Sequence, residues 1–247
     1  MKYYVNVDVR SGGKGGRGDG YGAISLLSGG IDSPVASWLS MRSGLRLQLV
    51  HFHSYPFSCS SAIAKARELA SVLLPYQGGG TLSLVPFLEI QENIFRNTPN
   101  NLRIVMYRRA MARIAEKIAG EAGASFIVTG DSLGQVSSQT LPNISTVEQS
   151  VAIPVLRPLI GFDKTEIIDV AKAIGTFEIS IRPHEDCCTL FAVGNPATRT
   201  DPSRVEKEEG KIDLPSLIED SVRKREIVEY DGSGSVMRGQ DAPGIPL

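Results

Sequence analysis

The chain has 247 residues, 42% of them apolar and 21% charged, which allows one large soluble domain with a sizeable buried core. It has no uninterrupted apolar run of about eighteen residues, which excludes a membrane span, and its start at Met1 lacks the apolar core of a secretion signal, so we expect a cytoplasmic protein. Three cysteines are too few for a disulfide framework, and a net charge of -1 shows none of the basic excess typical of proteins that hold nucleic acid by themselves.

The segment before residue 23 is too short to be a domain. Apolar and polar residues alternate over Tyr3–Val9, which predicts a half-buried strand. The stretch from Ser11 to Gly20 is dominated by glycine, a composition typical of a flexible linker. We therefore expect residues 1–22 to be an arm, or the end of a preceding domain.

From Ala23 onward, short apolar segments alternate with longer amphipathic ones. This β-α-β-α order favours a parallel sheet covered by helices on both faces, a doubly wound α/β fold. The predicted strands are Ala23–Leu27, Leu45–Phe52, Leu82–Val85 and Ser125–Thr129, and the predicted helices are Pro34–Arg42, Ser60–Leu74, Leu102–Ala122 and Lys164–Ile174.

The predicted helix Leu102–Ala122 has the clearest amphipathic pattern. Its apolar stripe runs from Ile104 to Ile118, whereas Arg108, Arg109 and Arg113 fall on the polar side. We therefore expect these three arginines to lie away from the core.

The last part of the chain is more polar. Residues 23–195 make up the predicted main domain, and residues 196–247 a C-terminal extension. The extension contains a charged segment, Arg204–Lys211, and one predicted short helix, Leu214–Val228. From Asp231 the chain is rich in Gly and Pro, which predicts a disordered end.

The predicted first strand of the main domain leads directly into the loop Ser28–Ser33, with sequence SGGIDS, and Pro34 then starts a helix. In an open parallel sheet, ligands bind beyond the carboxyl ends of the strands. Two glycines let backbone N–H groups approach an anion, and the helix N-terminus adds unpaired donors and partial positive charge. The loop therefore predicts an anion site. The alternative is a ligand-free turn in which Asp32 only caps the helix.

The loop lacks the Gly-Lys-Ser/Thr of a Walker A motif and the Gly-x-Gly-x-x-Gly of dinucleotide-binding loops. It resembles the Ser-Gly-Gly-x-Asp-Ser loop of the PP-loop ATP-pyrophosphatases, which hold the pyrophosphate end of ATP and release it when a substrate is adenylated. That resemblance implies binding of ATP, with Asp32 helping to place Mg²⁺ on the phosphates and no metal centre built by the protein alone.

Further blocks of sequence narrow the resemblance to one family. They are Leu26–Ala36, His51–His53, Arg108–Met111, Val128–Val136, Ser138–Thr140, Pro154–Gly161 and Asp186–Phe191. Together they resemble the tRNA 4-thiouridine synthetase family, from about residue 22 to residue 191. The resemblance implies a doubly wound parallel sheet of the adenine-nucleotide alpha-hydrolase-like type (PP-loop, HUP). It also implies an enzyme that adenylates a uridine of tRNA and replaces its O4 with sulfur.

The same resemblance implies the nucleotide contacts, position by position. The implied residues are Leu26, Leu27, Ser28, Gly29, Gly30, Ser33, His51, Phe52, Arg108, Gly130 and Gln139. Leu26 and Leu27 would lie beside the adenine. His51 and Phe52 would close that pocket from the end of the next strand.

Arg108, Gly130 and Gln139 are implied to complete the nucleotide site. Arg108 would stabilise charge developing at the α-phosphate, Gly130 would let ATP approach the backbone, and Gln139 would hydrogen-bond the nucleotide. Most of these residues have a plainer alternative. Leu26, Leu27, His51 and Phe52 could be core residues, Arg108 a solvated arginine and Gln139 an ordinary surface side chain.

Two adjacent cysteines in the last block carry the predicted sulfur chemistry. Family resemblance implies that Cys187 holds sulfur as a persulfide, whose terminal sulfur is nucleophilic near neutral pH. The alternative is that Cys187 and Cys188 are small buried apolar residues. Release of the sulfur needs a second thiol, for which Cys59 or an external thiol is the hypothesis, because adjacent Cα atoms lie about 3.8 Å apart, too close for an ordinary disulfide.

The family's pattern includes a ferredoxin-like part and a THUMP RNA-binding domain ahead of the catalytic domain, of which Tyr3–Val9 resembles the last strand, so we expect residues 1–22 to be a remnant of a THUMP-like region. Many members also carry a C-terminal rhodanese-like domain, which this sequence does not show. We therefore expect a fragment or a natural short form. The partners implied are tRNA and a cysteine desulfurase or other persulfide donor, and a partner subunit or a homodimer would supply tRNA capture. Two other functions stay open: sulfur delivery toward the thiazole of thiamine, and a non-catalytic ATP-binding module.

Overall fold

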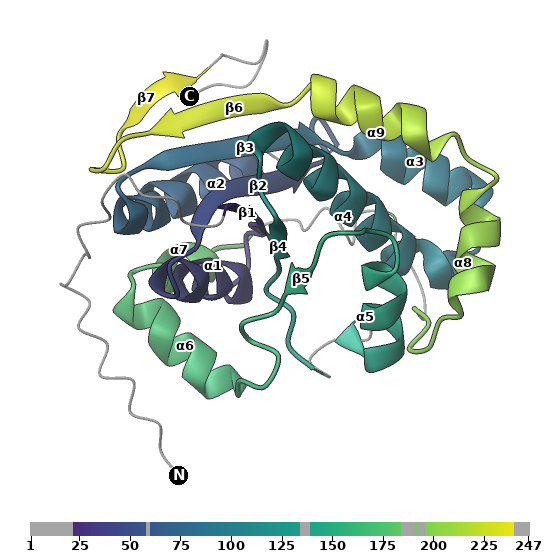
Figure 1. Ribbon diagram of the computed structural model, residues 1–247, viewed down its shortest axis with the longest axis horizontal. Coiled ribbons are helices and arrows are strands. Elements are labelled where there is room, and N and C mark those ends of the chain that lie inside the picture. The colour runs from purple at the N-terminus through teal and green to yellow at the C-terminus, as the bar shows by residue number, and fades with distance from the viewer. Residues whose placement is uncertain (1–21, 58–59, 134–138, 184–190, 192–195, 240–247) are drawn as a thin grey trace.

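The computed structural model describes residues 22–57, 60–133, 139–183, 191 and 196–239. These residues form one seven-stranded sheet with the order β5-β4-β1-β2-β3-β6-β7 (Figure 1). The strands are β1 (Gly22–Leu26), β2 (Arg46–His53), β3 (Gly80–Pro86), β4 (Phe126–Val128), β5 (Val155–Leu156), β6 (Glu226–Tyr230) and β7 (Val236–Gly239). The first five are parallel, and β6 and β7 join antiparallel at the β3 edge.

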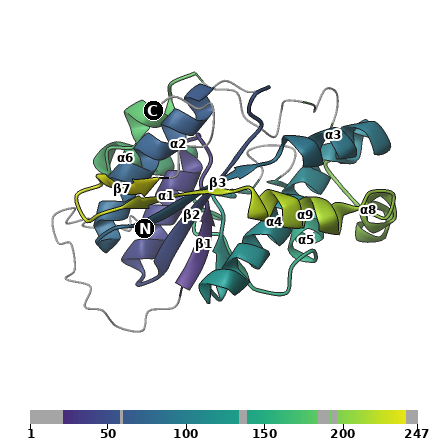
Figure 2. The same cartoon turned by 90° about the horizontal axis from the view of Figure 1, so that it is seen from above.

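Helices cover both faces of the sheet, as the doubly wound prediction required (Figure 2). One face carries α1 (Asp32–Arg42), α2 (Ser60–Leu73), α6 (Lys164–Ala173) and α7 (Phe177–Ser180), and the other carries α3 (Leu88–Asn97), α4 (Arg103–Ala122), α5 (Leu141–Glu148), α8 (Pro202–Glu209) and α9 (Leu214–Arg223). Two short 3₁₀ helices, η1 (Leu74–Gln77) and η2 (Asn100–Leu102), precede β3 and α4. No helix in the described ranges is both long and apolar enough to cross a bilayer.

Strand β1 lies at the centre of the parallel part of the sheet, and the order of the strands reverses on its two sides. The chain passes from β1 to β2 and β3 on one side, then returns to place β4 and β5 on the other. Ile24 of β1 packs in one core, and Ala23 and Leu27 pack in the other, because successive side chains of a strand point to opposite faces. The carboxyl ends of β1 and β4 therefore form the switch point at which doubly wound sheets bind ligands.

Helix α1 begins at Asp32, two residues earlier than predicted, so Pro34 is its third residue and not its first. The earlier start costs no hydrogen bond, because the first four N–H groups of a helix have no partner in the helix. The capping motif of α6 is present: Asp163 accepts from Thr165 N, and Glu166 accepts from Asp163 N at 2.9 Å.

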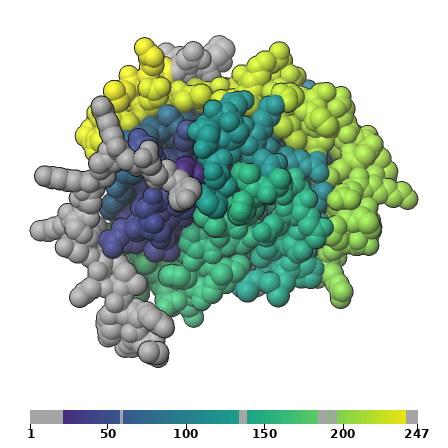
Figure 3. Space-filling model, in the orientation of Figure 1, coloured from purple at the N-terminus to yellow at the C-terminus, as the bar shows by residue number. Residues whose placement is uncertain are grey.

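The C-terminal segment differs from its prediction. The predicted helix Leu214–Val228 ends at Arg223, and the following residues form β6, whose burial alternates in the manner of a strand. The region after Asp231 was predicted to be disordered, but Val236–Gly239 forms β7 on the same sheet. The Asp231 carboxylate organises the turn between them by accepting from the amides of Ser233 and Ser235. In the space-filling view these yellow-green to yellow elements follow the upper and right margins of the molecule (Figure 3).

The expectation that Arg109 lies away from the core is wrong. Its side chain is 1% exposed, and its Nε donates to Glu209 Oε1 of α8 at 2.7 Å. Its Nη1 also donates to Thr146 O of α5. Helices α5 and α8 cover this side of α4, so a position that is polar in the sequence becomes a buried ion pair.

Candidate functional site

The loops that follow β1 and β4 touch at the switch point of the sheet. A Cβ placed on Gly130, just after β4, would lie 2.7 Å from Ser33 N and 2.8 Å from Ser33 Cα. A Cβ atom does not come that close to other heavy atoms, so only glycine lets the two loops meet in this way. In the structure Gly130 contacts the SGGIDS loop. Its role in making room for a nucleotide stays a prediction.

The two serines of the loop hold it closed on itself. Ser33 Oγ accepts from Ser28 N at 2.8 Å and lies 2.9 Å from Ser28 Oγ. Ser28 Oγ in turn accepts from Gly30 N at 3.2 Å. These bonds fix the loop at the start of α1, so its shape is set by its own residues.

The N-terminus of α1 has no side-chain cap. Its N-cap residue is Ile31, whose side chain makes no capping hydrogen bond. Asp32 is the first residue of the helix and does not cap it, so that part of the ligand-free alternative is wrong. Amides at a helix start next to glycines can bind an anion, and an anion site here stays a prediction.

Asp32 is paired with a residue that the sequence patterns did not single out. Lys164 Nζ lies 2.6 Å from Asp32 Oδ1, and both side chains are partly exposed. Lys164 is the first residue of α6, which the capping motif of Asp163 starts at this place. The structure thus brings a partly exposed lysine next to the SGGIDS loop. Only the capping motif in the sequence hinted that residue 164 begins an element.

Arg108 is not a solvated arginine. It forms an ion pair with Asp131, and both side chains are largely buried. Asp131 also accepts from Thr129 Oγ1 at 3.0 Å and lies 3.5 Å from Arg157 Nε. Burial alone would raise the pKa of Asp131, but the charge of Arg108, the Thr129 hydroxyl and the charge of Arg157 outweigh it and lower that pKa.

Asp131 and Arg157 are therefore candidate site residues that were not predicted from the sequence. A signal was present, since Asp131 lies three residues after the end of β4, at the carboxyl edge of the sheet. The Arg108–Asp131 pair fixes the guanidinium beside the β4 loop, on the side where Gly130 touches the SGGIDS loop. An arginine held in this way is pre-oriented to meet an anion.

The two histidines at the end of β2 lie close to the same edge. His51 is buried, and its Nδ1 lies 2.9 Å from Leu27 O, at the end of β1. His53 is nearly buried, and burial together with the charge of His51 lowers its pKa to about 4. His51 thus contacts the segment that carries the predicted adenine contacts.

The apolar candidates are core residues in the structure. Phe52 packs edge-on against Phe87 with ring centroids 5.4 Å apart. Leu27 is buried in one core, and Leu26 packs against the other. Their side chains are therefore committed to packing, and any contact that they make with a nucleotide would come from the backbone.

Gln139 lies next to residues that the structure does not describe. Its Oε1 is buried and has no hydrogen-bond partner among the described residues. This amide oxygen is therefore open to a ligand donor or to the adjoining loop.

The predicted sulfur-handling residues, Cys187 and Cys188, and the hypothetical resolving residue Cys59 lie outside the described residues. The described chain ahead of this region is anchored as far as Arg182. Lys65 Nζ of α2 donates to Ser180 O and Arg182 O, both at 2.7 Å. Helix α2 thus fixes where this segment leaves the fold.

Within the described ranges, no group of three or more His, Cys, Asp and Glu side chains is placed to hold a metal ion. A hydrated Mg²⁺ needs no such cage, because it is commonly held by substrate phosphates and one or two carboxylates. Asp32 is the carboxylate of the SGGIDS loop and is the residue that fits this role.

Comparison with known proteins points to one family. Residues 18–214 match the family model described as "Thiamine biosynthesis protein (ThiI)". The chain is 46% identical over 206 residues to a probable tRNA sulfurtransferase of Brevibacillus brevis, covering 83% of this chain and 52% of the relative.

Comparison with solved structures points to the same family. The chain matches a 4-thiouridine synthetase in complex with RNA and ATP at 45% identity and a TM-score of 0.81, covering 85% of this chain and 55% of the other. An NMN synthetase from Francisella tularensis matches at 15% identity and a TM-score of 0.53, which supports the fold alone. The chain spans about half the length of the two closer relatives.

Proposed function

The chain belongs to the ThiI family, and on that basis we propose that it is an ATP-dependent sulfurtransferase that converts a uridine of tRNA to 4-thiouridine. The observation that carries the proposal is the corner between β1 and α1, where uncapped helix amides, Lys164 and Arg108 surround the switch point of the sheet. A relative solved with RNA and ATP supports the choice of both substrates.

The proposed reaction first makes the uridine oxygen a leaving group. O4 of the uridine attacks the α-phosphorus of ATP, the bond to the β-phosphate breaks, and pyrophosphate departs. The SGGIDS amides and Lys164 would hold the pyrophosphate end, because both offer donors to an anion. The Arg108 guanidinium would stabilise charge on the α-phosphate.

Asp32 changes its partner in this scheme. In the structure its carboxylate pairs with Lys164 at 2.6 Å. When ATP is bound, we propose that Asp32 serves a Mg²⁺ ion on the phosphates, and that Lys164 contacts a phosphate oxygen. Mg²⁺ would neutralise phosphate charge there. Both side chains are partly exposed, so the exchange of partners does not disturb the core.

The second half of the proposal delivers sulfur. The terminal sulfur of a Cys187 persulfide attacks C4, the bond from C4 to the adenylated oxygen breaks, and AMP leaves with that oxygen. A thiolate, from Cys59 or from an external thiol, then attacks the Cys187 sulfur. This releases 4-thiouridine and leaves a disulfide at Cys187, which an external reductant must reduce. A cysteine desulfurase or other persulfide donor would load Cys187 again.

A second acceptor is favoured by one finding, the description of the matching family as a thiamine biosynthesis protein. In that case the same residues would pass sulfur toward the thiazole of thiamine, and tRNA would not stimulate release of pyrophosphate. We propose that tRNA is the principal acceptor and that the protein works in the cytoplasm, either alone or as a homodimer.

One assay tests the proposal. The protein is incubated with ATP, Mg²⁺, a persulfide donor and unmodified tRNA, and AMP and 4-thiouridine are measured. We expect both products with the native chain. With Cys187→Ser we expect release of pyrophosphate without 4-thiouridine, because AMP leaves the uridine only when sulfur attacks C4. ATP binding without AMP would identify a non-catalytic nucleotide-binding module instead, and AMP formation indifferent to tRNA would favour the small-molecule acceptor.

A further inference from the structure

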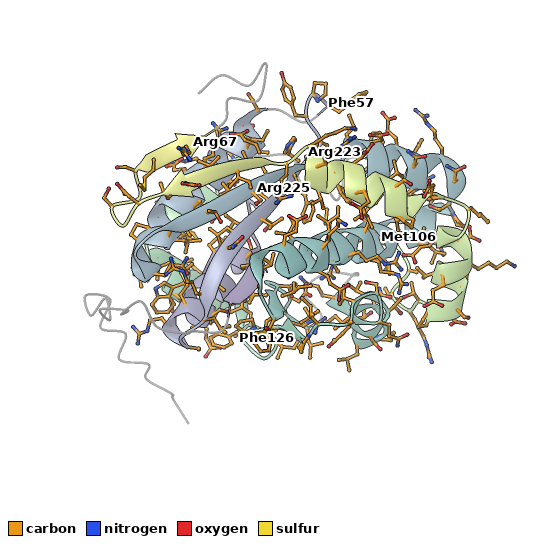
Figure 4. The ribbon with its side chains drawn as sticks, turned by 45° about the horizontal axis from the view of Figure 1, so that its top comes forward. Phe57, Arg67, Met106, Phe126, Arg223 and Arg225 are labelled. Atoms are coloured by element: carbon orange, nitrogen blue, oxygen red, sulfur yellow. The ribbon has the colours of Figure 1, made fainter. Side chains whose placement is uncertain are left out.

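Three phenylalanines form a cluster on the surface beyond the carboxyl edge of the sheet. Phe191 lies between the other two, with ring centroids 6.4 Å from Phe57 and 5.4 Å from Phe95. Phe57 is 61% exposed and Phe95 is 41% exposed. Figure 4 shows Phe57 at the upper margin of the view, on a loop that projects from the ribbon. Large exposed rings gathered from three segments are unusual on a soluble domain and mark a contact surface.

Arg103 holds this cluster together. Its guanidinium carbon lies 4.2 Å from the centre of the Phe95 ring, the geometry of a cation–π contact. Its Nη1 donates to Phe191 O at 3.3 Å and its Nη2 donates to Phe95 O at 3.0 Å. One charged side chain thus packs on the Phe95 ring and ties the backbones of Phe95 and Phe191 together.

The cluster lies close to the proposed chemistry. Arg103 starts α4 and precedes Arg108 by five residues, about 7.5 Å of helix. Phe191 follows Cys187 by four residues, so the chain limits their separation to about 14 Å. A group bound on these rings would therefore be within reach of both proposed halves of the reaction.

A hollow with exposed arginines adjoins the cluster. Its volume is about 540 Å³, and its lining includes Asn101, Arg199 and Arg204. Its lining includes Leu102, the residue before Arg103. Two segments of the lining are joined by a hydrogen bond, in which Ala197 N donates to Asn101 O at 2.9 Å. Asp201 is the acidic residue among the described lining, and its carboxylate is engaged in capping α8 through Ser203 N at 3.0 Å.

We propose that Phe57, Phe95, Phe191 and Arg103 form an aromatic platform on which unpaired nucleobases of the substrate RNA stack, while Arg199 and Arg204 bind its phosphates. The inference rests on the proposed function and adds the surface that grips the RNA. Unpaired bases stack on aromatic and guanidinium planes, and a neighbouring cationic groove follows the backbone. A chain with net charge -1 needs such a local site, because its average charge gives none.

The platform also suits the reaction. An atom on the base edge is reached most easily when the nucleotide is unpaired or turned out of its stack, and turned-out bases are held against aromatic side chains. A stacking contact does not depend on base identity, so the platform contributes affinity for RNA and not sequence specificity. The adenylation residues then act on whichever uridine is presented.

The test measures binding of an unmodified tRNA transcript to the full chain, with Phe57 as the probe position because its exposure makes substitution harmless to the core. We expect Phe57→Ala and Phe57→Leu to weaken binding about tenfold, which corresponds to about 1.4 kcal/mol and lies within the usual range for one stacked base. Phe57→Tyr should bind within about twofold of the native chain. Met237→Ala, a change at a 68% exposed position on β7, is the matched control and should change nothing.

Two further measurements sharpen the test. Arg199→Gln with Arg204→Gln should reduce the slope of log affinity against log salt by about one to two. ATP affinity, measured without RNA, should stay unchanged in every variant.

Three results would overturn the inference alone: native tRNA affinity in Phe57→Leu, a change of oligomeric mass in the Phe57 variants, or loss of turnover with the protein persulfide donor at unchanged tRNA affinity. The second would make the surface an interface between copies, and the third a docking site for the donor. Absence of tRNA binding by the native chain would instead overturn the proposed tRNA substrate, and this inference with it.

Discussion

Asp32 and Lys164 meet across 132 residues of sequence, and their contact is a property of the fold and not of any motif. The SGGIDS pattern predicted Asp32, because a loop between strand and helix has a recognisable local composition. The capping motif predicted that Lys164 begins a helix, but nothing near it predicted a contact with Asp32. Asp131 was likewise recognisable only as a polar residue after a strand, and its ion pairs with Arg108 and Arg157 join distant segments. Residue chemistry was thus predictable where it is local, and was missed where two distant segments combine.

Gly130 gives the sharpest test at this scale. Gly130→Ala would put a Cβ 2.7 Å from Ser33 N, so the SGGIDS loop must shift and ATP affinity should fall at least tenfold. Gly120→Ala is the control, because no atom lies within 4 Å of a Cβ there and helix propensity favours alanine by roughly 1 kcal/mol. Calorimetric ATP titration of both variants checks this, and equal affinities would mean that the contact does not shape the site.

His53 predicts how stability depends on pH. Burial and the charge of His51 lower its folded-state pKa from 6.5 to about 4. Between about pH 6.5 and pH 4, His53 is protonated in the unfolded chain but stays neutral in the folded protein. Acidification through this range should therefore lower the free energy of unfolding by up to about 3 kcal/mol. Urea unfolding across this range should show a shallower pH dependence for His53→Gln. Parallel curves for the two proteins would contradict the assignment.

At the scale of elements, alternation and amphipathic periodicity predicted four of the five parallel strands and four of their helices. Strand β5 was missed because Val155–Leu156 is too short to show a period. The C-terminal strands were missed because β6 follows α9 without a clear break, and because a glycine-rich turn before β7 resembles a disordered tail. In helix α4 the periodicity predicted the apolar face correctly. It could not predict that α5 and α8 cover the polar face and bury Arg109.

The ion pair between α4 and α8 should therefore contribute strongly to stability. Glu209→Gln would leave Arg109 buried without its charge partner, and loss of one partner of a buried pair costs about 3–5 kcal/mol. Glu206→Gln is the matched control on the same helix, since Glu206 is 59% exposed and lies 3.7 Å from Arg109, so a change of less than about 1 kcal/mol is expected. Chemical denaturation decides between them. Equal losses would show that α8 is not anchored through Glu209.

For the whole molecule, one sheet gathers the site from segments spread over the sequence. The loop after β1, the end of β2, the start of α4, the loop after β4 and the start of α6 all come together at the carboxyl edge. The fold class followed from the order of elements, because parallel strands joined by helices have few possible arrangements. The exposed aromatic platform did not, since its three rings come from three separate segments.

In the proposed reaction, AMP is transferred to a uridine oxygen of tRNA before sulfur replaces that oxygen. Mass spectrometry of the AMP formed from tRNA labelled with ¹⁸O at uridine O4 tests this directly. We predict that one ¹⁸O atom appears in AMP for each 4-thiouridine made, because the adenylated oxygen leaves with the phosphate. Unlabelled AMP, with the ¹⁸O released to water, would contradict it.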